Sequence, residues 1–249
     1  NLELFSESEK KSSMKLFDEI LEPIIGYAPH TQGNDALMLW LNLDPDYRTT
    51  STTVNDWLNF MKPSEIFSQA NAARRPTDNS THLSWDGGDF LQCNVDRVLS
   101  PAAGGWTVCS RYTEADWTSS STLAADNDSN NSFIKNTGSG LSMKATGTSG
   151  TQTKAINFDT PADLVDDQYY NIIVTCSASA VLKCYIDGVV QSETPQYADD
   201  TYNLTMSEVG GKNANAWMIV GDIQEVLVWP TELTALQVAD VNTYLNNKF

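Results

Sequence analysis

The chain has 249 residues, a formal net charge of −17 and a hydrophobic content of 41%. This composition supports a buried core and excludes a wholly disordered chain, and the length suits one large β-sandwich. The negative charge repels phosphate backbones and anionic membranes, so we expect no nucleic-acid partner and no membrane insertion. Such acidity is compatible with a bound cation such as Ca²⁺, although solubility alone is the simpler explanation.

Residues 1–34 differ from the rest of the chain and are interpreted as an N-terminal helical arm or linker. Apolar residues recur at helical spacing between Ser8 and Ile25, and Pro23 and Gly26 end this pattern. A short amphipathic helix is not stable alone in water, so its apolar stripe packs either on its own domain or on a neighbouring subunit. The candidate partner-docking residues are Met14, Phe17, Ile20, Leu21 and Ile24.

Residues 35–249 read as a single all-β domain. Short β-rich runs alternate with clusters of Gly, Asn, Asp, Ser and Thr, as is typical of sandwiches. We expect strands at Ala36–Leu43 and Gly105–Tyr112, a strand–turn–strand at Leu83–Leu91, and a central pair at Tyr169–Thr175 and Val181–Ile186. Asp187 and Gly188 predict a tight hairpin turn after that pair.

The end of the chain predicts a buried strand followed by one helix. Gly221–Trp229 is the strand, and Pro230 stops it. Thr234 is a candidate N-cap with Gln237 three residues later, which is the capping-box pattern. An apolar face then follows on the helix, formed by Val238, Val241 and Leu245.

The four cysteines show neither a Cys-x-x-Cys pair nor a zinc-binding spacing. If Ser177–Ala180 forms a two-residue turn, Cys176 and Cys184 point to opposite faces of the sheet and cannot bridge. We therefore predict buried free thiols, consistent with folding in a reducing cytoplasm.

In order and spacing, several of these segments resemble the laminin-G-like / concanavalin A-like lectin-glucanase jelly-roll family. The matching segments are Trp85–Leu91, Trp106–Val108, Tyr185–Val189, Gly221–Trp229 and Leu233–Val238. The resemblance covers roughly residues 36–249 and implies a two-sheet antiparallel jelly-roll sandwich with a short C-terminal helix. Members of the family mostly bind rather than catalyse, and they occur in bacterial surface proteins and in bacteriophage virion proteins.

The chain lacks the acidic pattern of the related glucanases, Glu-x-Asp-x-x-Glu. Glu225 is the only acid in the middle of its strand, on the face expected to hold Ile223, Leu227 and Trp229. A glycosidase needs two carboxyl groups flanking the scissile bond. We therefore predict that the protein is not an enzyme, and that Glu225 is held by neighbouring polar groups.

Sugar binding needs an aromatic face and directional polar groups, and loops rich in Asp and Asn offer oxygen ligands for Ca²⁺. A solvated loop with Asx turns is the simpler interpretation of the run 126–131. Four tryptophans are expected in the core (Trp40, Trp85, Trp106 and Trp229), and three are surface candidates (Trp57, Trp117 and Trp217). The candidate glycan-binding residues are Trp117, Asn127, Asn130, Asn131 and Tyr202, and the candidate metal ligands are Asp126, Asp128, Asp199 and Asp200.

The resulting hypothesis is a non-catalytic phage virion protein, present in many copies or as a homo-oligomer, that decorates the capsid or forms part of an adhesion fibre. It would assemble in the host cytoplasm, contact other virion proteins through the N-terminal arm, and present loops to host-surface glycans. Two alternatives remain open: a purely structural cement between virion subunits, and a secreted or cell-surface bacterial carbohydrate-binding module.

Overall fold

The computed structural model describes residues 37–50, 53–117, 119–125, 132–137, 141–146, 153–158, 164–195, 203–211 and 217–249. The predicted N-terminal arm and its five candidate docking residues lie outside these ranges, so both stay predictions. No helix in the described part of the chain is long and apolar enough to cross a membrane.

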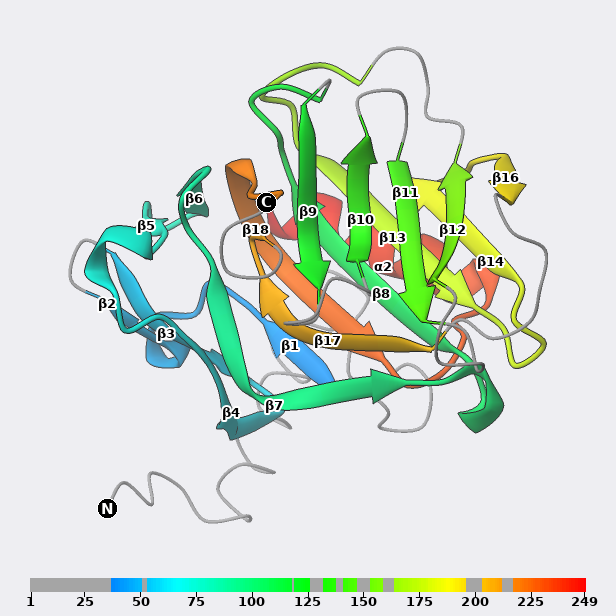
Figure 1. Cartoon of the computed structure of the whole chain (residues 1–249), viewed down its shortest axis with the longest axis horizontal. Helices are drawn as coiled ribbons and strands as arrows, with labels where there is room; N and C mark the ends of the chain where they lie inside the picture. The colour runs from blue at the N-terminus through cyan, green and yellow to red at the C-terminus, as the bar shows by residue number, and fades with distance from the viewer. Residues whose placement is uncertain are drawn as a thin grey trace.

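Two antiparallel sheets face each other (Figure 1), which confirms the predicted all-β jelly-roll sandwich. Sheet A contains, in spatial order, β15 (Val189–Val190), β14 (Leu182–Ile186), β13 (Tyr170–Cys176), β8 (Trp106–Tyr112), β18 (Val220–Trp229), β6 (Leu83–Asp86) and β5 (Thr77–Asp78), with β1 (Leu39–Leu41) also paired to β18. Sheet B contains β16 (Glu193–Pro195), β12 (Thr153–Phe158), β11 (Leu141–Thr146), β10 (Ser132–Thr137), β9 (Ser120–Ala125), β17 (Leu204–Val209), β7 (Leu91–Leu99), β4 (Lys62–Ser68), β3 (Val54–Asn59) and β2 (Arg48–Thr50). The described connections contain three short 3₁₀ turns, Pro45–Tyr47, Ala72–Arg74 and Pro101–Ala103.

The main core fills the space between the two sheets. Successive side chains of a strand point to opposite faces. Trp106, Val108 and Tyr112 of β8 therefore lie in this core, while Cys109 points outward. All four tryptophans predicted to be core residues are buried. Trp85 and Trp106 lie in this core, and Trp40 and Trp229 pack on the opposite face of sheet A.

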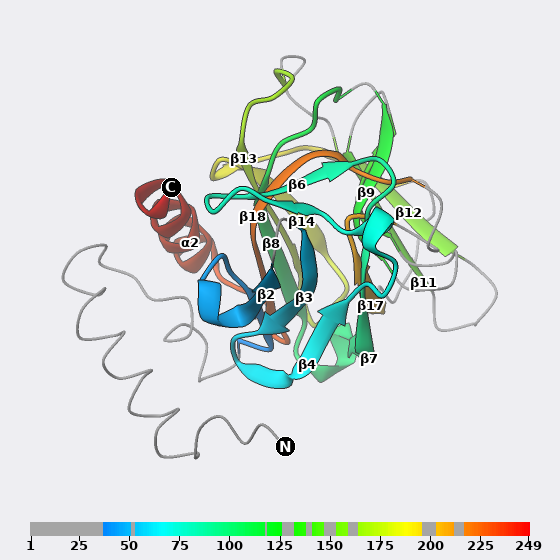
Figure 2. The same cartoon turned by 90° about the vertical axis from the view of Figure 1, so that its left-hand side faces the viewer.

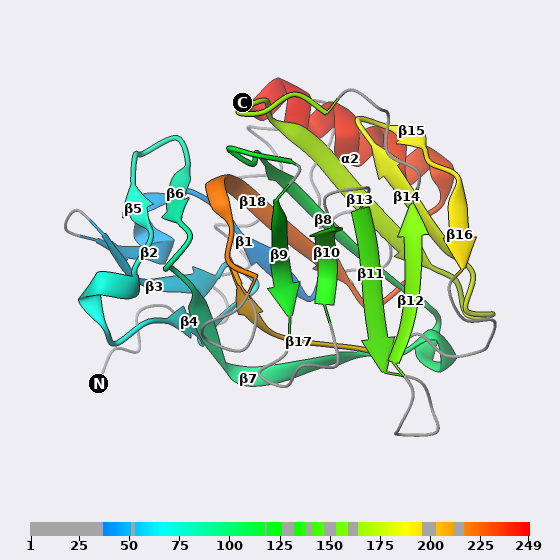
Figure 3. The same cartoon turned by 45° about the horizontal axis from the view of Figure 1, so that its top comes forward.

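Helix α2 (Ala235–Lys248) covers the outer face of sheet A (Figures 2 and 3). The predicted capping box is present: Gln237 N donates to Thr234 Oγ1, and Thr234 N donates to Gln237 Oε1. The helix forms a second core with outward residues of the sheet, among them Cys109, Ile173 and Leu227. Its own buried residues are Val238, Val241, Tyr244 and Leu245.

Glu225 lies fully buried beneath this helix. Its carboxylate accepts hydrogen bonds from Trp40 Nε1 and Tyr244 Oη, and it forms an ion pair with Lys248 Nζ at 2.9 Å. A carboxylate held by three donors anchors the helix to the sheet and is not exposed to act as a general acid, which confirms the expected structural role.

The predicted face of Glu225 is only partly right. The pairing of β18 with β8 shifts register between Ile223 and Glu225, so that β18 has one extra residue, Gln224. A bulge of this kind places two successive side chains on one face. Ile223 therefore lies in the core between the sheets, whereas Glu225 shares the outer face with Leu227 and Trp229.

One of the two predicted hairpin turns is confirmed, and the predicted length of the other is wrong. Asp187 and Gly188 have φ values of 48° and 81°, as a tight Asp-Gly hairpin requires. The turn after β13 has three residues instead of two, because Ser177 N donates to Val181 O. Cys184 consequently pairs with Val174, and both Cys176 and Cys184 point into the core between the sheets. The predicted opposite faces were wrong, whereas the predicted buried free thiols are confirmed.

Candidate functional site

Most of the predicted binding residues lie outside the described part of the chain. This holds for Asn127, Asn130, Asn131 and Tyr202, and for the four candidate metal ligands Asp126, Asp128, Asp199 and Asp200. These assignments therefore stay predictions. Within the described ranges, no group of three or more His, Cys, Asp or Glu side chains is placed to hold a metal ion.

Trp117 is described, and its predicted surface position is wrong. The side chain is 6% exposed and its ring packs against Tyr112 and Tyr170, with ring centroids 5.3 and 5.6 Å apart. Trp117 N also donates to Asp166 Oδ1, which ties this segment to a second loop. Trp57, another surface candidate, is fully buried in β3.

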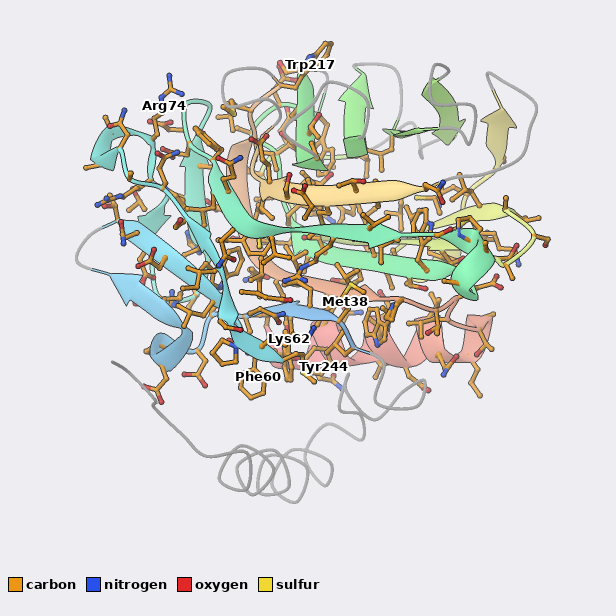
Figure 4. The ribbon with its side chains drawn as sticks, turned by 60° about the horizontal axis from the view of Figure 1, so that its bottom comes forward. Met38, Phe60, Lys62, Arg74, Trp217 and Tyr244 are labelled. Atoms are coloured by element: carbon orange, nitrogen blue, oxygen red, sulfur yellow. The ribbon has the colours of Figure 1, made fainter. Side chains whose placement is uncertain are left out.

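Trp217 is the exposed tryptophan of this protein. Its side chain is 39% exposed, whereas the other six tryptophans of the chain are each 6% exposed or less. It lies in the turn just before β18, and in Figure 4 it projects at the edge of the molecule, far from Phe60 and Tyr244. A large indole presented at the rim of a sandwich is a surface suited to a flat apolar ligand face.

The backbone of Trp217 is strained. Its φ value is +58°, in the left-handed region that bulky side chains avoid. The turn is held by the bond from Ile219 N to Gly210 O, and Met218 packs so closely on Gly211 that a Cβ there would overlap its sulfur. Strain of this kind persists only where the surroundings hold it, and it concentrates at functional positions.

Two further exposed residues follow the turn of Trp217, one three residues along the chain and one across the strand pair. Val220, at the start of β18, is 47% exposed and pairs with the exposed Asp86 of β6. The Asp86 carboxylate accepts a bond from Gly88 N at 2.8 Å and keeps further lone pairs for other donors. We call Trp217, Val220 and Asp86 the rim surface. It combines an aromatic face with a directional acceptor.

Two buried carboxyl groups hold the loops beside this rim. Burial raises the pKa of Glu114 to about 8; the bond from Ser121 Oγ opposes this rise, and the charge of Asp116 adds to it. Burial likewise raises the pKa of Asp89 to about 6, against the bond from Asp86 N. The Glu114 carboxyl group accepts from a side chain of β9, and the Asp89 carboxyl group accepts from a backbone N–H, so each has a structural partner in the described chain.

A sequence profile of the Laminin_G_3 family, from the concanavalin A-like lectin/glucanases superfamily, matches residues 86–239. The chain belongs to this superfamily. No curated protein matches it in sequence.

Solved structures with the same fold include a Trypanosoma rangeli sialidase in complex with the inhibitor DANA. That match has a TM-score of 0.60 and 12% identity, and covers 94% of this chain and 38% of the sialidase chain. The ligand-binding domain of botulinum neurotoxin serotype D, in complex with N-acetylneuraminic acid, matches with a TM-score of 0.52 and 13% identity, covering 86% of this chain and 52% of the other. The chain thus spans between a third and about half of the length of these proteins, and the likeness shows the fold alone.

Proposed function

We propose that this chain is a non-catalytic glycan-binding domain in which the rim surface stacks a sugar ring on Trp217. The observation that carries the proposal is the exposure of this one indole on a strained turn. The apolar C–H face of a sugar packs on an aromatic ring, and its hydroxyl groups donate to nearby acceptors such as Asp86.

The superfamily of concanavalin A-like lectins and glucanases supports carbohydrate recognition as the general activity. The neurotoxin domain with the same fold is described in complex with a sugar acid, N-acetylneuraminic acid. The sialidases of that fold are enzymes, but this chain spans only 38% of the chain matched. The buried state of Glu225 in the described structure supports the non-enzymatic assignment.

A glycan array with three proteins tests the proposal. The native protein is expected to bind a defined glycan set, and Trp217→Ala is expected to reduce each affinity at least tenfold. Val98→Ala is the matched control, because Val98 is an exposed apolar side chain of β7 outside the rim surface. Equal binding by the native protein and Trp217→Ala would contradict the proposed site, and an array that stays blank at high protein concentration would favour the structural cement.

For the biological setting we propose a bacteriophage particle that carries the domain in many copies, attached through residues 1–34. Many weak sites on one particle give a high total affinity, so each site alone needs only modest strength. Deleting residues 1–34 is expected to abolish incorporation into particles and leave array binding intact. Isolation of the native protein from a bacterial surface, with no particle, would instead favour the secreted bacterial module.

A further inference from the structure

Arg111 lies on the outer face of sheet A, beside the last turns of α2. Its Nε donates to Gln224 Oε1 at 2.7 Å, and its Nη1 donates to Asn171 Oδ1 at 2.9 Å and to Asn246 Oδ1 at 3.4 Å. Gln224 reaches this position because the bulge in β18 turns it to the outer face. These bonds hold the guanidinium in one orientation.

Two aromatic rings complete the setting of Arg111. Its Cζ lies 5.6 Å from the ring centroid of Tyr169 and 6.0 Å from that of Phe249, within the range of cation–π contacts. Tyr169 is itself held, because its hydroxyl donates to Asp222 Oδ2 at 3.2 Å. The side chain is therefore preorganised before any ligand arrives.

Among the described residues, no carboxylate is hydrogen-bonded to Arg111. Two more deeply buried arginines of the described chain are paired with carboxylates, Arg48 with Asp78 and Arg97 with Glu65. Within the described chain, all three side-chain hydrogen bonds of Arg111 instead go to neutral amide oxygens, and its Nη2 has no hydrogen-bond partner there. Partial burial also lowers the pKa of Arg111, against the opposing effect of Asp187. A half-buried guanidinium whose hydrogen bonds all go to neutral groups is less well compensated than one paired with a carboxylate, and a bound anion would supply that pairing.

The surroundings favour a singly charged anion on a hydroxylated ligand. Asp222 is partly exposed and accepts from Ser84 Oγ at 2.6 Å, and His82 Nε2 lies 3.6 Å from its other oxygen. A carboxylate that has taken two donors keeps acceptor capacity for hydroxyl groups. The net charge of −17 disfavours multiply charged ligands such as phosphates. Val220 and Asp222 also connect this area to the rim surface along the first residues of β18.

We propose that Arg111 binds the carboxylate of an acidic sugar, with Asp222 accepting its hydroxyl groups. The inference rests on the proposed glycan-binding function and extends it to a ligand class. The site is separate from Trp217, so the two assignments are testable apart.

The test is a calorimetric titration with D-glucuronate, D-glucose and inorganic phosphate. Glucuronate is expected to bind at least tenfold more tightly than glucose or phosphate, and Arg111→Gln is expected to remove this preference. Lys183→Gln is the control, because Lys183 is an exposed cation of β14 and its loss changes the net charge equally. Arg111→Lys is expected to keep part of the preference, since it retains the charge and loses the planar donor pair.

A spectroscopic readout on the native protein covers the case in which Arg111→Gln fails to fold. Addition of glucuronate is expected to shift the Arg111 Nε–H signal, and an unchanged signal at saturation overturns the inference. Equal responses to phosphate and glucuronate also overturn the assignment to a sugar acid. The two proposals can fail separately. If glycan binding on the array does not depend on Trp217, the rim proposal fails. If Trp217→Ala still binds glucuronate through Arg111, this inference stands.

Discussion

Replacing Glu114 by glutamine is expected to remove a large pH dependence of stability. Burial raises the pKa of this carboxyl group from its ordinary value of 4.5 to about 8, so it stays protonated in the folded protein at neutral pH. In the unfolded chain the same group ionises near its ordinary value. Its contribution to stability is therefore complete below pH 4.5 and falls as the pH rises towards 8.

The magnitude follows from the two pKa values. Each pH unit between them costs about 1.4 kcal/mol, so the native protein loses about 3 kcal/mol from this group between pH 5 and pH 7.5. Glutamine is neutral throughout and lacks this loss. The stability of Glu114→Gln relative to the native protein is thus expected to rise by about 3 kcal/mol over that range.

Urea unfolding at pH 5, 6, 7 and 7.5 measures this difference. A constant offset between the two proteins is allowed, because a glutamine amide accepts the bond from Ser121 Oγ with a different strength than the carboxyl group does. The prediction concerns only the change of this difference with pH. Asp96→Asn, at an exposed carboxylate of β7, is the control and is expected to show a much smaller change. Parallel pH profiles for Glu114→Gln and the native protein would refute the reasoning.

Three further predictions concern the supports of the sandwich. Glu225→Gln removes the ion pair with Lys248 and is expected to lower the free energy of unfolding by about 3 kcal/mol, measured by urea unfolding. We expect no polysaccharide turnover in the native protein, so this variant has none to lose. Gly210→Ala adds a Cβ that overlaps the Trp85 ring, at a φ of +86°, and is expected to lower the free energy of unfolding by about 3 kcal/mol. Gly104→Ala, at a φ of +116° with no atom within 4 Å of the added Cβ, is the control and is expected to cost about 1 kcal/mol. Equal losses in the two variants would contradict the overlap. Thr234→Ala removes the capping box of α2 and is expected to cost about 1 kcal/mol, seen as a lower thermal midpoint.

Local sequence patterns were sufficient to predict where several helices and strands begin or end. The capping box at Thr234 and the Asp187-Gly188 turn depend on residues close together in the chain, and both are present as predicted. The apolar face of the final helix likewise follows from spacing alone. These features can be predicted without knowing which strands pair with one another in the sheets.

Register and burial depended on contacts that spacing does not encode. The extra residue at Gln224 changes the face of every residue on one side of it, and the three-residue turn after Cys176 moves Cys184 to the same face. Trp117 follows a polar stretch yet is buried, because the loop carrying Asp166 closes over its backbone. The Arg111 environment joins β8, β13, β18 and α2, so no local pattern indicates it.

The most direct test of the proposed function is a proton–nitrogen spectrum of the tryptophan side chains during titration with the strongest glycan from the array. The chain has seven indole N–H groups, and the signal that is lost in Trp217→Phe is that of the exposed one. If Trp217 stacks on the sugar, its signal moves progressively to saturation while the signals of the six buried indoles stay in place. Saturable glycan binding that leaves the Trp217 signal unchanged would contradict it.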